Sequence, residues 1–319
     1  MPHKDNAEGN LLPRFSCVVD DIPAGLRLDR YAAENLKLLS RSQIKARKLR
    51  ARVNSRDVKI SRILKPGDRL DFFWEDAEPI DLIPEDIPLD IIYEDDRVAL
   101  INKAQGMVVH PGAGNRSGTL ANALYFRSLQ KGRSLTAGTR PGIVHRLDKD
   151  TSGLIITAWD EEAHLFLAEQ FKSRKVIKTY AAIVQGRPIE NTGRIEMPIG
   201  RNRKNRKLFA VDLKGKPSLT FYKVVRSYQN YSLLLLRPKT GRTHQLRVHL
   251  KYLGIPVLGD PLYGKMDSRF PIATLMLHAK KLSIALPGKG RETFRTKFPE
   301  RFSEFFAFIH KYSHAEGSK

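Results

Sequence analysis

The nonapeptide His145–Gly153, with the sequence HRLDKDTSG, is a polar turn that ends on glycine. It places the carboxylate of Asp148 among three basic side chains, those of His145, Arg146 and Lys149. Apolar residues at 143–144 and at 154–158 predict a short strand that enters this turn and a strand that leaves it. A loop between two strands can direct a side chain into a cleft. The nonapeptide therefore makes Asp148 the candidate catalytic residue.

The basic neighbours of Asp148 indicate which chemistry would suit it. They favour the charged carboxylate, which fits a nucleophile or an electrostatic stabiliser better than a general acid. An Asp that caps a turn or forms a surface ion pair gives the same local pattern. Both interpretations stay open on this stretch alone.

The composition predicts a polyanionic partner. The chain has 319 residues, which favours two domains, and a formal net charge of +22. This charge is clustered, which favours nucleic acid over an anionic membrane surface, and no apolar run reaches the ~18 residues of a membrane-spanning helix. Cys17 is the single cysteine, which excludes intrachain disulfides and cysteine-based zinc sites. The polar first ten residues lack a signal-peptide core, so we expect a cytoplasmic protein.

Residues 13–75 are expected to form a small α/β domain after a disordered tail at 1–12. Apolar residues at helical spacing from Leu26 to Ala32 predict one helix, and Arg41–Arg50 predicts a second, basic helix with Ser40 as its N-cap. Turn residues at 53–58 and 65–68 precede a predicted strand over 69–74. This organisation resembles the small RNA-binding module named after ribosomal protein S-four.

Two basic runs are expected to contact RNA phosphates. The first has six Lys or Arg and no acid, and its cations are Arg41, Lys45, Arg47, Lys48, Arg50 and Arg52. A merely solvated helix face is the alternative for this run. The second, at 201–207, precedes an apolar strand and is expected in a loop, with Arg201, Arg203 and Lys204 as its candidate RNA contacts.

An acidic linker is predicted between the two domains. Residues 75–96 carry ten Asp or Glu, three Pro and no Lys or Arg. Prolines favour a semi-extended chain, and acids are repelled by RNA. We place the linker proper at 76–87, the second domain at 88–310 and a short tail at 311–319.

The second domain is predicted to have an α+β fold. Its strands and helices mix without regular βαβ alternation, which indicates a largely antiparallel sheet. Strands are expected over 179–184 and 232–236. Asp160 is the expected cap of a helix whose core-facing stripe is Ala163, Phe166, Leu167 and Phe171. A further helix, Gln245–Leu253, is expected to have Thr243 as its cap and to end at Gly254.

Several motifs, in order, resemble those of the RluA-type pseudouridine synthases. The resemblance covers about residues 88–300 and runs through Ile101–Pro111, His145–Gly153, Lys178-Thr179-Tyr180, Thr240–Leu250, Gly259–Gly264 and Leu277–Ala279. One departure is Ala104, where the family usually has Pro after the Lys, which affects the expected loop conformation. The resemblance implies an α+β fold with a central cleft.

The resemblance also implies an activity and roles for four residues. Such enzymes break the C1′–N1 bond of uridine and join C1′ to C5, with no atoms gained or lost. Asp148 would be the essential catalytic Asp, and Tyr180 would stack on the base and assist proton removal at C5. Arg242 would pair with Asp148, and Arg146 would fill the gap that the flipped target leaves in the RNA. No cofactor or metal is implied.

Each of these assignments has an alternative. Packing alone favours a tyrosine at position 180 in a strand, and Arg242 and Arg247 are equally suited to contact phosphates. Which of these two arginines pairs with Asp148 stays open, although we favour Arg242. His244 and His249 are five apart, which misses the i,i+4 spacing of shared metal ligation on a helix. Lys103 and His110 are expected in the wall of the cleft.

Two other function classes compete with this interpretation. A non-catalytic RNA-binding ribosome-assembly factor would need the same charge and N-terminal module, but the presence of Asp148, Tyr180 and Arg242 argues against it. A methyltransferase is disfavoured because no Gly-rich loop follows a predicted strand, and a zinc deaminase because its cysteines are absent. We expect a monomer, away from membranes, that modifies 23S ribosomal RNA, with transfer RNA as the alternative substrate.

Overall fold

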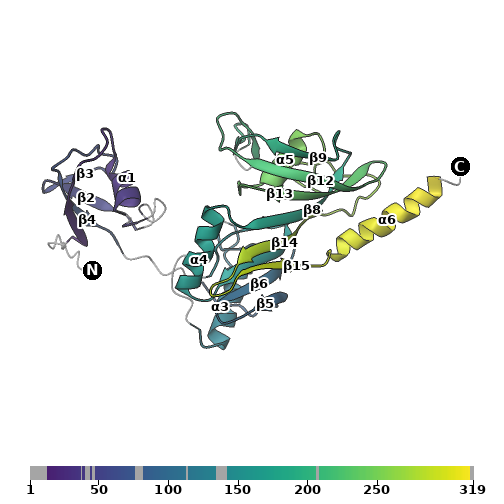
Figure 1. The fold of residues 1–319 in the computed structure, drawn as a ribbon, viewed down its shortest axis with the longest axis horizontal. Helices are drawn as coiled ribbons and strands as arrows, with labels where there is room; N and C mark the ends of the chain where they lie inside the picture. Colours follow the sequence, from purple (N-terminus) through teal and green to yellow (C-terminus); the bar gives the residue numbers. More distant parts are fainter. Residues whose placement is uncertain are drawn as a thin grey trace, which may run out of the picture. The chain divides into compact units, whose positions relative to one another are not determined.

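The chain divides into two compact units, Met1–Ile80 and Asp81–Lys319, in the computed structural model (Figure 1). The structure describes residues 13–36, 38–39, 44, 47–75, 82–112, 114–133, 142–205 and 208–316. The expected tail at 1–12, the predicted cap Ser40 and the predicted RNA contacts Arg41 and Lys45 lie outside these residues. Each unit has its own hydrophobic core, as expected for two domains.

The N-terminal unit contains a four-stranded antiparallel sheet in the order β1-β4-β2-β3. Its elements are β1 (Phe15–Val18), α1 (Leu28–Arg30), the π-helical turn η1 (Tyr31–Asn35), β2 (Arg50–Val53), β3 (Arg56–Val58) and β4 (Arg69–Phe73). Asn54 and Ser55 join β2 to β3 with φ angles of 51° and 65°, the backbone that a tight hairpin requires. The predicted hairpin at 53–58 and the strand from Arg69 are thus confirmed.

The basic segment of this unit does not continue as a helix to Arg50. Arg47 and Lys48 lie in a turn, and Arg50 begins β2. The helical prediction is wrong there because burial alternates from residue to residue, with Leu49, Ala51 and Val53 buried. This period of two belongs to a strand that packs one face on a core.

The second unit, Asp81–Lys319, is built on one nine-stranded sheet. The strand order is β5-β6-β7-β14-β8-β13-β12-β9, with β15 paired to β14. The strands are β5 (Ile91–Glu94), β6 (Val98–Lys103), β7 (Ser152–Ala158), β8 (Ile177–Gln185), β9 (Thr192–Glu196), β12 (Leu219–Ser227), β13 (Tyr231–Pro238), β14 (Leu277–Ala285) and β15 (Arg291–Arg295). Only β7 and β14 pair in parallel within this sheet, which confirms a largely antiparallel α+β fold.

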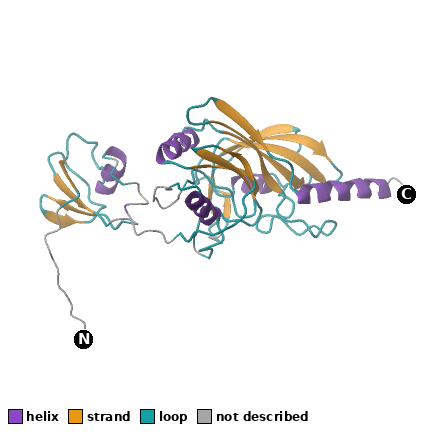
Figure 2. Ribbon diagram, turned by 90° about the horizontal axis from the view of Figure 1, so that it is seen from below, coloured by secondary structure: helices purple, strands orange, loops and turns teal. Residues whose placement is uncertain are grey.

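The helices and a small ribbon complete this unit. They are α3 (Leu120–Gln130), α4 (Glu161–Lys172), α5 (Gln245–Tyr252), α6 (Glu300–Glu316) and the two-stranded ribbon of β10 (Ile199–Arg201) and β11 (Phe209–Val211). Figure 2 shows α6 running outward to the C-terminus. The tail expected from residue 311 is therefore wrong up to Glu316, because α6 continues to that residue.

The centre of the sheet brings distant segments into register. Gly153 of β7 is paired with Ala279 of β14, and Ala279 is paired with Tyr180 of β8. Gly153 has a φ of 111°, and a Cβ there would lie 2.4 Å from the carbonyl oxygen of Ala279. Only glycine allows this approach. The register therefore places Tyr180 level with the start of β7, directly after the nonapeptide turn.

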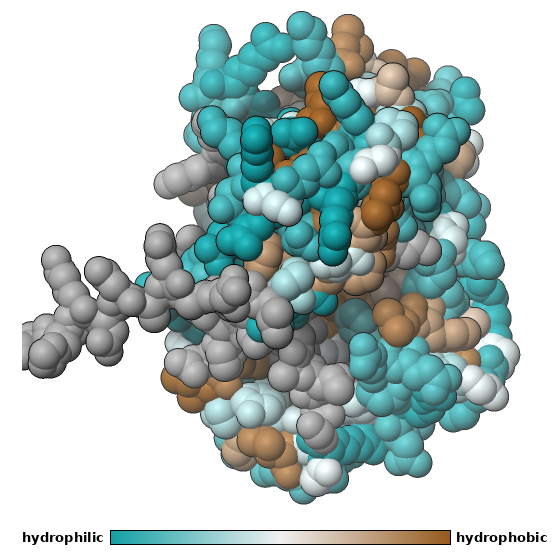
Figure 3. Space-filling model, turned by 90° about the vertical axis from the view of Figure 1, so that its left-hand side faces the viewer, coloured by the Kyte–Doolittle hydropathy of each residue, from teal (hydrophilic) through white to brown (hydrophobic). Residues whose placement is uncertain are grey.

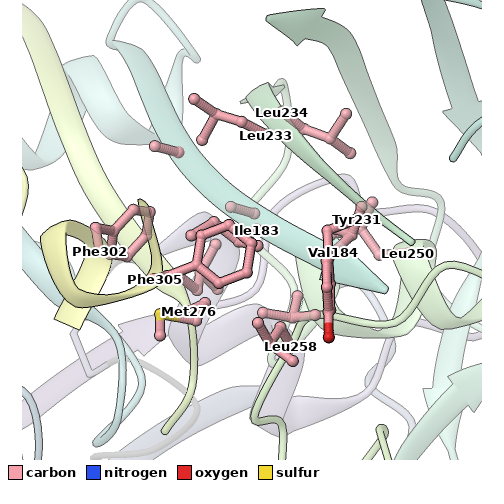
Figure 4. Close-up of a cluster of buried hydrophobic side chains, with 14 of the residues drawn as sticks. Ile183, Val184, Tyr231, Leu233, Leu234, Leu250, Leu258, Met276, Phe302 and Phe305 are labelled. Atoms are coloured by element: carbon pink, nitrogen blue, oxygen red, sulfur yellow. The ribbon is translucent and has the colours of Figure 1, made fainter. Parts of the chain in front are cut away.

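Several hydrophobic cores hold this sheet in place. In one, Phe302 and Phe305 of α6 pack with Ile183 of β8 and with Met276 (Figure 4). In another, Ala163 and Leu167 of α4 are buried with residues of β6 and β7. The Asp160 carboxylate accepts a hydrogen bond from the Ala163 backbone nitrogen at 2.8 Å, which confirms the predicted cap. Phe166 does not belong to the core-facing stripe, because it is 40% exposed.

Part of the acidic segment belongs to the second unit. Leu82 is buried in a core with residues of β6, α3 and β7, and the Glu85 carboxylate accepts hydrogen bonds from the Gly118 backbone nitrogen at 3.0 and 3.1 Å. β5 follows at Ile91. The placement of residues 82–87 in the linker is therefore wrong, because they pack on the second unit, and 76–81 lie outside the described residues. Acids in this segment serve ion pairs, such as that of Glu94 with Arg127 at 2.6 Å.

The face of the molecule drawn in Figure 3 is largely polar. Hydrophilic side chains cover much of the face drawn in Figure 3, with apolar ones scattered between them. Within the described ranges, no helix combines the length and the apolar character needed to cross a bilayer.

Candidate active site

A cleft of about 550 Å³ lies in the second unit, at the nonapeptide turn. Its walls come from that turn, the end of α4, the start of β8 and the segment that leads into α5. Of the described residues that line it, seven are Lys or Arg, and Asp148 is the one Asp or Glu. The basic lining residues are Arg146, Lys172, Arg174, Lys178, Lys239, Arg242 and Arg247. A concave site of this charge attracts a polyanion and presents it with a single carboxylate.

Lys103 holds the turn that carries Asp148 by hydrogen bonds to main-chain carbonyl groups. The Lys103 ammonium donates hydrogen bonds to the carbonyl oxygens of Lys149 at 3.0 Å, Met107 at 2.8 Å and Ala104 at 2.7 Å. Lys103 is 1% exposed and does not line the cleft. The prediction that it forms part of the cleft wall is therefore wrong. Burial lowers the pKa of Lys103 to about 7, and the charges of Asp150 and Asp148 oppose this shift. Three ammonium hydrogens thus meet three carbonyls and fix the turn.

Arg247, rather than Arg242, forms the ion pair with Asp148. Its Nη1 lies 3.6 Å from Oδ2 of Asp148, whose side chain is 20% exposed. The same guanidinium donates two hydrogen bonds of 2.7 Å to Asp260, whose side chain is fully buried. Arg242 instead donates from Nε to the carbonyl oxygen of Pro217 at 3.1 Å. The preference for Arg242 as the partner is therefore wrong, because α5 turns residue 247 inward, where it is 3% exposed.

The start of α5 also differs from the prediction. His244 is the N-cap residue, with a φ of 55° and no side-chain cap hydrogen bond, so Thr243 does not cap the helix. The Gln245 side chain orders this turn, since its Oε1 accepts from the backbone nitrogen of Arg242 at 3.0 Å. Gly254 ends the helix as predicted, with a φ of 77°. These contacts position Arg247 on the first turn of α5.

The histidines of α5 have protein partners. His244 shares a hydrogen bond of 2.8 Å with the hydroxyl of Tyr263, and His249 shares one of 2.9 Å with the hydroxyl of Thr220. Tyr263 in turn lies beneath Arg247, whose guanidinium carbon is 5.1 Å from the ring centroid. The two histidines therefore brace the wall behind Arg247.

Tyr180 lies half-buried in β8, where it lines the cleft and packs against two cores. Burial raises the pKa of the Tyr180 phenol, and the negative charge of Asp148 raises it further. The phenol therefore keeps its proton at neutral pH. It can donate a hydrogen bond, but it removes a proton from substrate only if its own proton leaves to another acceptor.

His145 does not add a positive charge beside Asp148. Its Nε2 accepts a hydrogen bond of 3.0 Å from the backbone nitrogen of Ile156, and its ring stacks on Phe171 with centroids 4.4 Å apart. Burial, followed by the charge of Lys178, lowers the pKa of His145 to about 3. The ring is thus neutral, and the expectation of a third cation in the nonapeptide is wrong.

Other predicted site residues lie in three places. Arg146 is exposed and lines the cleft beside Asp148. Arg201 ends β10, and its guanidinium carbon lies 5.3 Å from the centroid of Phe209. Arg203 and Lys204 follow in an exposed turn, as predicted for this run, whereas residues 206–207 lie outside the described ranges.

The remaining predicted RNA contacts belong to the N-terminal unit. Lys48 pairs with Glu75 at 2.8 Å, and Arg52 pairs with Asp57 at 3.2 Å. Arg50 is exposed, and Arg47 is half-buried. The basic run is thus partly balanced by acids of the same unit.

Asp260 and Lys103 are the functional positions whose roles the sequence did not predict. Asp260 lies within a motif that carried the resemblance, Gly259–Gly264, but only its buried contact with Arg247 shows its role. Similarly, Lys103 lies in the motif Ile101–Pro111. For both residues, the signal in the sequence that could have indicated a role was a charged side chain inside a motif that matches the family.

Comparisons with known proteins identify the relatives of this chain. A family model described as RNA pseudouridylate synthase matches residues 97–252. The chain is 44% identical over 294 residues to Ribosomal large subunit pseudouridine synthase D of Borreliella burgdorferi, with 90% of each chain covered. It is 37% identical over 312 residues to a protein of the same name from Zymomonas mobilis, with 93% of this chain and 98% of the relative covered.

Two solved human structures are also similar to this chain. RNA Pseudouridylate Synthase Domain Containing 1 has a TM-score of 0.54 and 31% identity, over 66% of this chain and 83% of that one. RNA Pseudouridylate Synthase Domain Containing 4 has a TM-score of 0.57 and 26% identity, over 69% and 92%. Because the match to the Borreliella burgdorferi relative extends over 90% of both chains, this chain belongs to the family of RNA pseudouridine synthases.

Proposed function

We propose that this RNA pseudouridine synthase isomerises uridines of large-subunit ribosomal RNA, with Asp148 as its catalytic carboxylate. The observation that carries the assignment is the position of Asp148, the one acid among the described residues of a cleft with seven Lys or Arg. The ribosomal substrate is supported by the printed names of the two bacterial relatives. Transfer RNA is the alternative substrate.

The reaction requires a carboxylate that acts at the sugar or the base. The C1′–N1 bond breaks, a C1′–C5 bond forms, C5 loses a proton and N1 gains one, so that no atoms are gained or lost. Arg247 orients Asp148 for this task, and Asp260 holds Arg247 by two hydrogen bonds. A carboxylate held in this way loses little conformational freedom when the substrate binds, so the free-energy cost of orienting it is small.

Tyr180 supports the uracil ring. Its side chain lines the cleft on β8, which β14 separates from β7 and the nonapeptide turn, and an aromatic ring stacks well on a flipped base. Because the phenol is protonated, it can take up the C5 proton only if it gives its own proton to another acceptor. Among the described residues that line the cleft, Asp148 is the carboxylate that can accept this proton.

Arg146 fills the gap left by the flipped base. It is exposed, two residues before Asp148, on the same turn. Flipping costs a few kcal/mol, and a planar cation that stacks in the vacated position offsets part of this cost. Arg242 and the loop cations Arg201, Arg203 and Lys204 contact phosphates around the target.

The N-terminal unit serves as an S-four-like RNA-binding module. Its basic segment from Arg41 to Arg52 supplies phosphate contacts that are independent of sequence. We expect the enzyme to act as a monomer. We expect the enzyme to act in the cytoplasm, where a ribosomal RNA substrate is available.

Pseudouridine mapping of total RNA from cells with and without this gene tests the proposal. We expect one or a few pseudouridines of large-subunit ribosomal RNA to disappear without the gene and to return with the wild-type gene. The Asp148→Asn gene should not restore them. Loss of sites in transfer RNA alone would contradict the ribosomal substrate, and an unchanged map would contradict the proposed reaction in the cell.

A further inference from the structure

We propose that Lys178 binds a phosphate group that flanks the target uridine, at a subsite on the floor of the cleft. The inference rests on the proposed function in one respect, namely that an RNA nucleotide enters this cleft. It adds a ligand to a residue that has no part in the reaction scheme above.

Lys178 lies in β8, two positions before Tyr180, and both side chains line the cleft. Side chains two apart on a strand point to the same face, with about 6.6 Å of strand between them. A uracil stacked on Tyr180 therefore leaves its sugar and phosphates within reach of the long Lys178 side chain. The ammonium is placed for the backbone of the same nucleotide that Tyr180 holds by its base.

The ammonium of Lys178 has no acidic partner within the described part of the chain. Its side chain is half-buried, and no Asp or Glu described here forms an ion pair with it. Burial, with no opposing charge, lowers the pKa of Lys178. A desolvated cation without a counter-charge is costly, so a ligand that supplies an anion is favoured.

Three other cations of the cleft have protein partners, and Arg146, Arg174 and Lys239 are exposed to solvent. Arg247 is held by Asp260 and Asp148, and Arg242 donates to a main-chain carbonyl. Lys172 lies 3.6 Å from Glu169 on the exposed surface of α4. These contacts distinguish Lys178 as the half-buried ammonium whose charge no acid offsets.

Access to the ammonium passes over Gly241. A Cβ at position 241 would lie 3.9 Å from Nζ of Lys178, so a longer side chain there would cover the ammonium. The φ of Gly241 is not in the left-handed region, and the backbone therefore does not require glycine at this position. The missing side chain leaves space in front of Lys178, which is what a bound phosphate needs.

Phosphate is the chemistry that fits this position. An RNA nucleotide offers anionic oxygens only on its phosphates, whereas the uracil carbonyls and the ribose hydroxyls are neutral. Lys is among the residues that most often contact phosphate oxygens in nucleic-acid complexes. The neighbouring His145 is neutral and Phe171 is apolar, with its ring centroid 6.0 Å from Nζ, so neither competes for the anion.

The test compares the binding of uridine 3′,5′-bisphosphate with that of uridine by NMR titration of the full-length protein. We expect Lys178→Met to weaken bisphosphate binding by about tenfold, the size of one charged hydrogen bond, and to leave uridine binding unchanged. Lys178→Arg should retain most of the bisphosphate preference. Lys175→Met is the matched control, because Lys175 is exposed and lies outside the cleft lining, and it should bind both ligands as the wild type does.

A second variant approaches the subsite from the other side. Gly241→Leu keeps the charge of Lys178 but covers the ammonium, so it should also reduce the preference for the bisphosphate. Equal bisphosphate-to-uridine ratios in wild type, Lys178→Met and Gly241→Leu would overturn the proposal, as would an equal loss in Lys175→Met.

Failure of this proposal is distinguishable from failure of the proposed function. Ligand binding requires no turnover, so the titration is repeated in the Asp148→Asn background. A phosphate preference that depends on Lys178 in a protein that forms no pseudouridine would leave the subsite standing and overturn only the proposed reaction. Normal pseudouridine formation without this preference would overturn only the subsite.

Discussion

Nη1 of Arg247 lies 3.6 Å from Oδ2 of Asp148. The arginine cannot follow substrate, because two hydrogen bonds of 2.7 Å fix its guanidinium to Asp260 and its side chain is 3% exposed. Asp260 itself accepts from the backbone nitrogens of Leu262 and Tyr263 at 2.9 and 3.0 Å. The carboxylate of Asp148 is thus oriented by a buried cation that is itself immobile, which is the arrangement expected for a preorganised site.

Replacement of Asp148 by Asn should abolish pseudouridine formation and leave RNA affinity close to that of wild type. Asn has nearly the same shape but cannot act as a nucleophile or accept a proton as a carboxylate does. Single-turnover formation of pseudouridine and equilibrium RNA binding measure the two effects. A chelator should not change the wild-type rate. Turnover that survives in the variant, or is lost with the chelator, would contradict the assigned chemistry.

Arg247→Met should destabilise the protein strongly, whereas Arg242→Met should not. Removal of Arg247 leaves the fully buried Asp260 carboxylate unpaired, which costs about 3–5 kcal/mol. Arg242 is half-buried and has no acidic partner among the described residues, so its loss should cost less than about 1 kcal/mol. Urea unfolding of both variants gives the free energies.

A third variant separates stability from catalysis at this pair. In Arg247→Met combined with Asp260→Leu, no charge is left buried, so much of the lost stability should return. Turnover should stay low, because Asp148 has still lost its orienting cation. Equal losses of stability in Arg247→Met and Arg242→Met would show that Arg247 is not the key contact of Asp260.

Tyr180→Phe should retain the fold and lose most of its turnover. Stacking on the base survives, but the hydroxyl that relays a proton does not. In the wild type, burial raises the pKa of the phenol, so its ionisation should produce no change in turnover as the pH rises from about 7 to about 9. Single-turnover rates across this pH range provide the measurement, and an alkaline transition that Tyr180→Phe abolishes would argue for a phenolate.

Arg146→Ala should slow turnover mainly on structured RNA. Without the arginine, nothing offsets the vacancy left by the flipped base, and flipping is costliest where the target is stacked. A substrate with the target in a flexible, unpaired loop should therefore lose less than one with a stacked target. Comparison of single-turnover rates on the two RNAs decides this, and equal losses on both would remove the vacancy-filling role.

Deletion of residues 1–80 should weaken RNA binding and flatten its salt dependence. Each lost phosphate contact lowers the slope of log affinity against log salt by roughly 0.9 on a duplex. Lys48 and Arg52 already have acidic partners, so the total loss should be below that of six contacts. Asp148, Tyr180 and Arg247 lie in the other unit, and turnover at saturating RNA should persist. An unchanged salt slope would mean that the basic segment is a solvated face.

The amino-acid sequence determined the local features of this protein. The Asp160 cap of α4, the hairpin over 53–58 and the end of α5 at Gly254 were predicted correctly, because each depends on residues a few positions apart. A run of apolar residues indicated β7, the irregular mixture of strands and helices indicated the α+β fold, and ordered motifs drew attention to Asp148. Where two local signals conflicted, as at Arg50, the buried alternation decided in favour of a strand.

Only the tertiary structure decided the partners of Asp148. The sequence could not choose between Arg242 and Arg247, because the choice depends on which face of α5 meets Asp260. Nor could it show that His145 is neutral, or that Lys103 holds the nonapeptide turn, because both follow from burial by segments distant along the chain. Burial and charge pairing are set when β7, β14 and β8 meet in one register, and that meeting is a property of the folded chain alone.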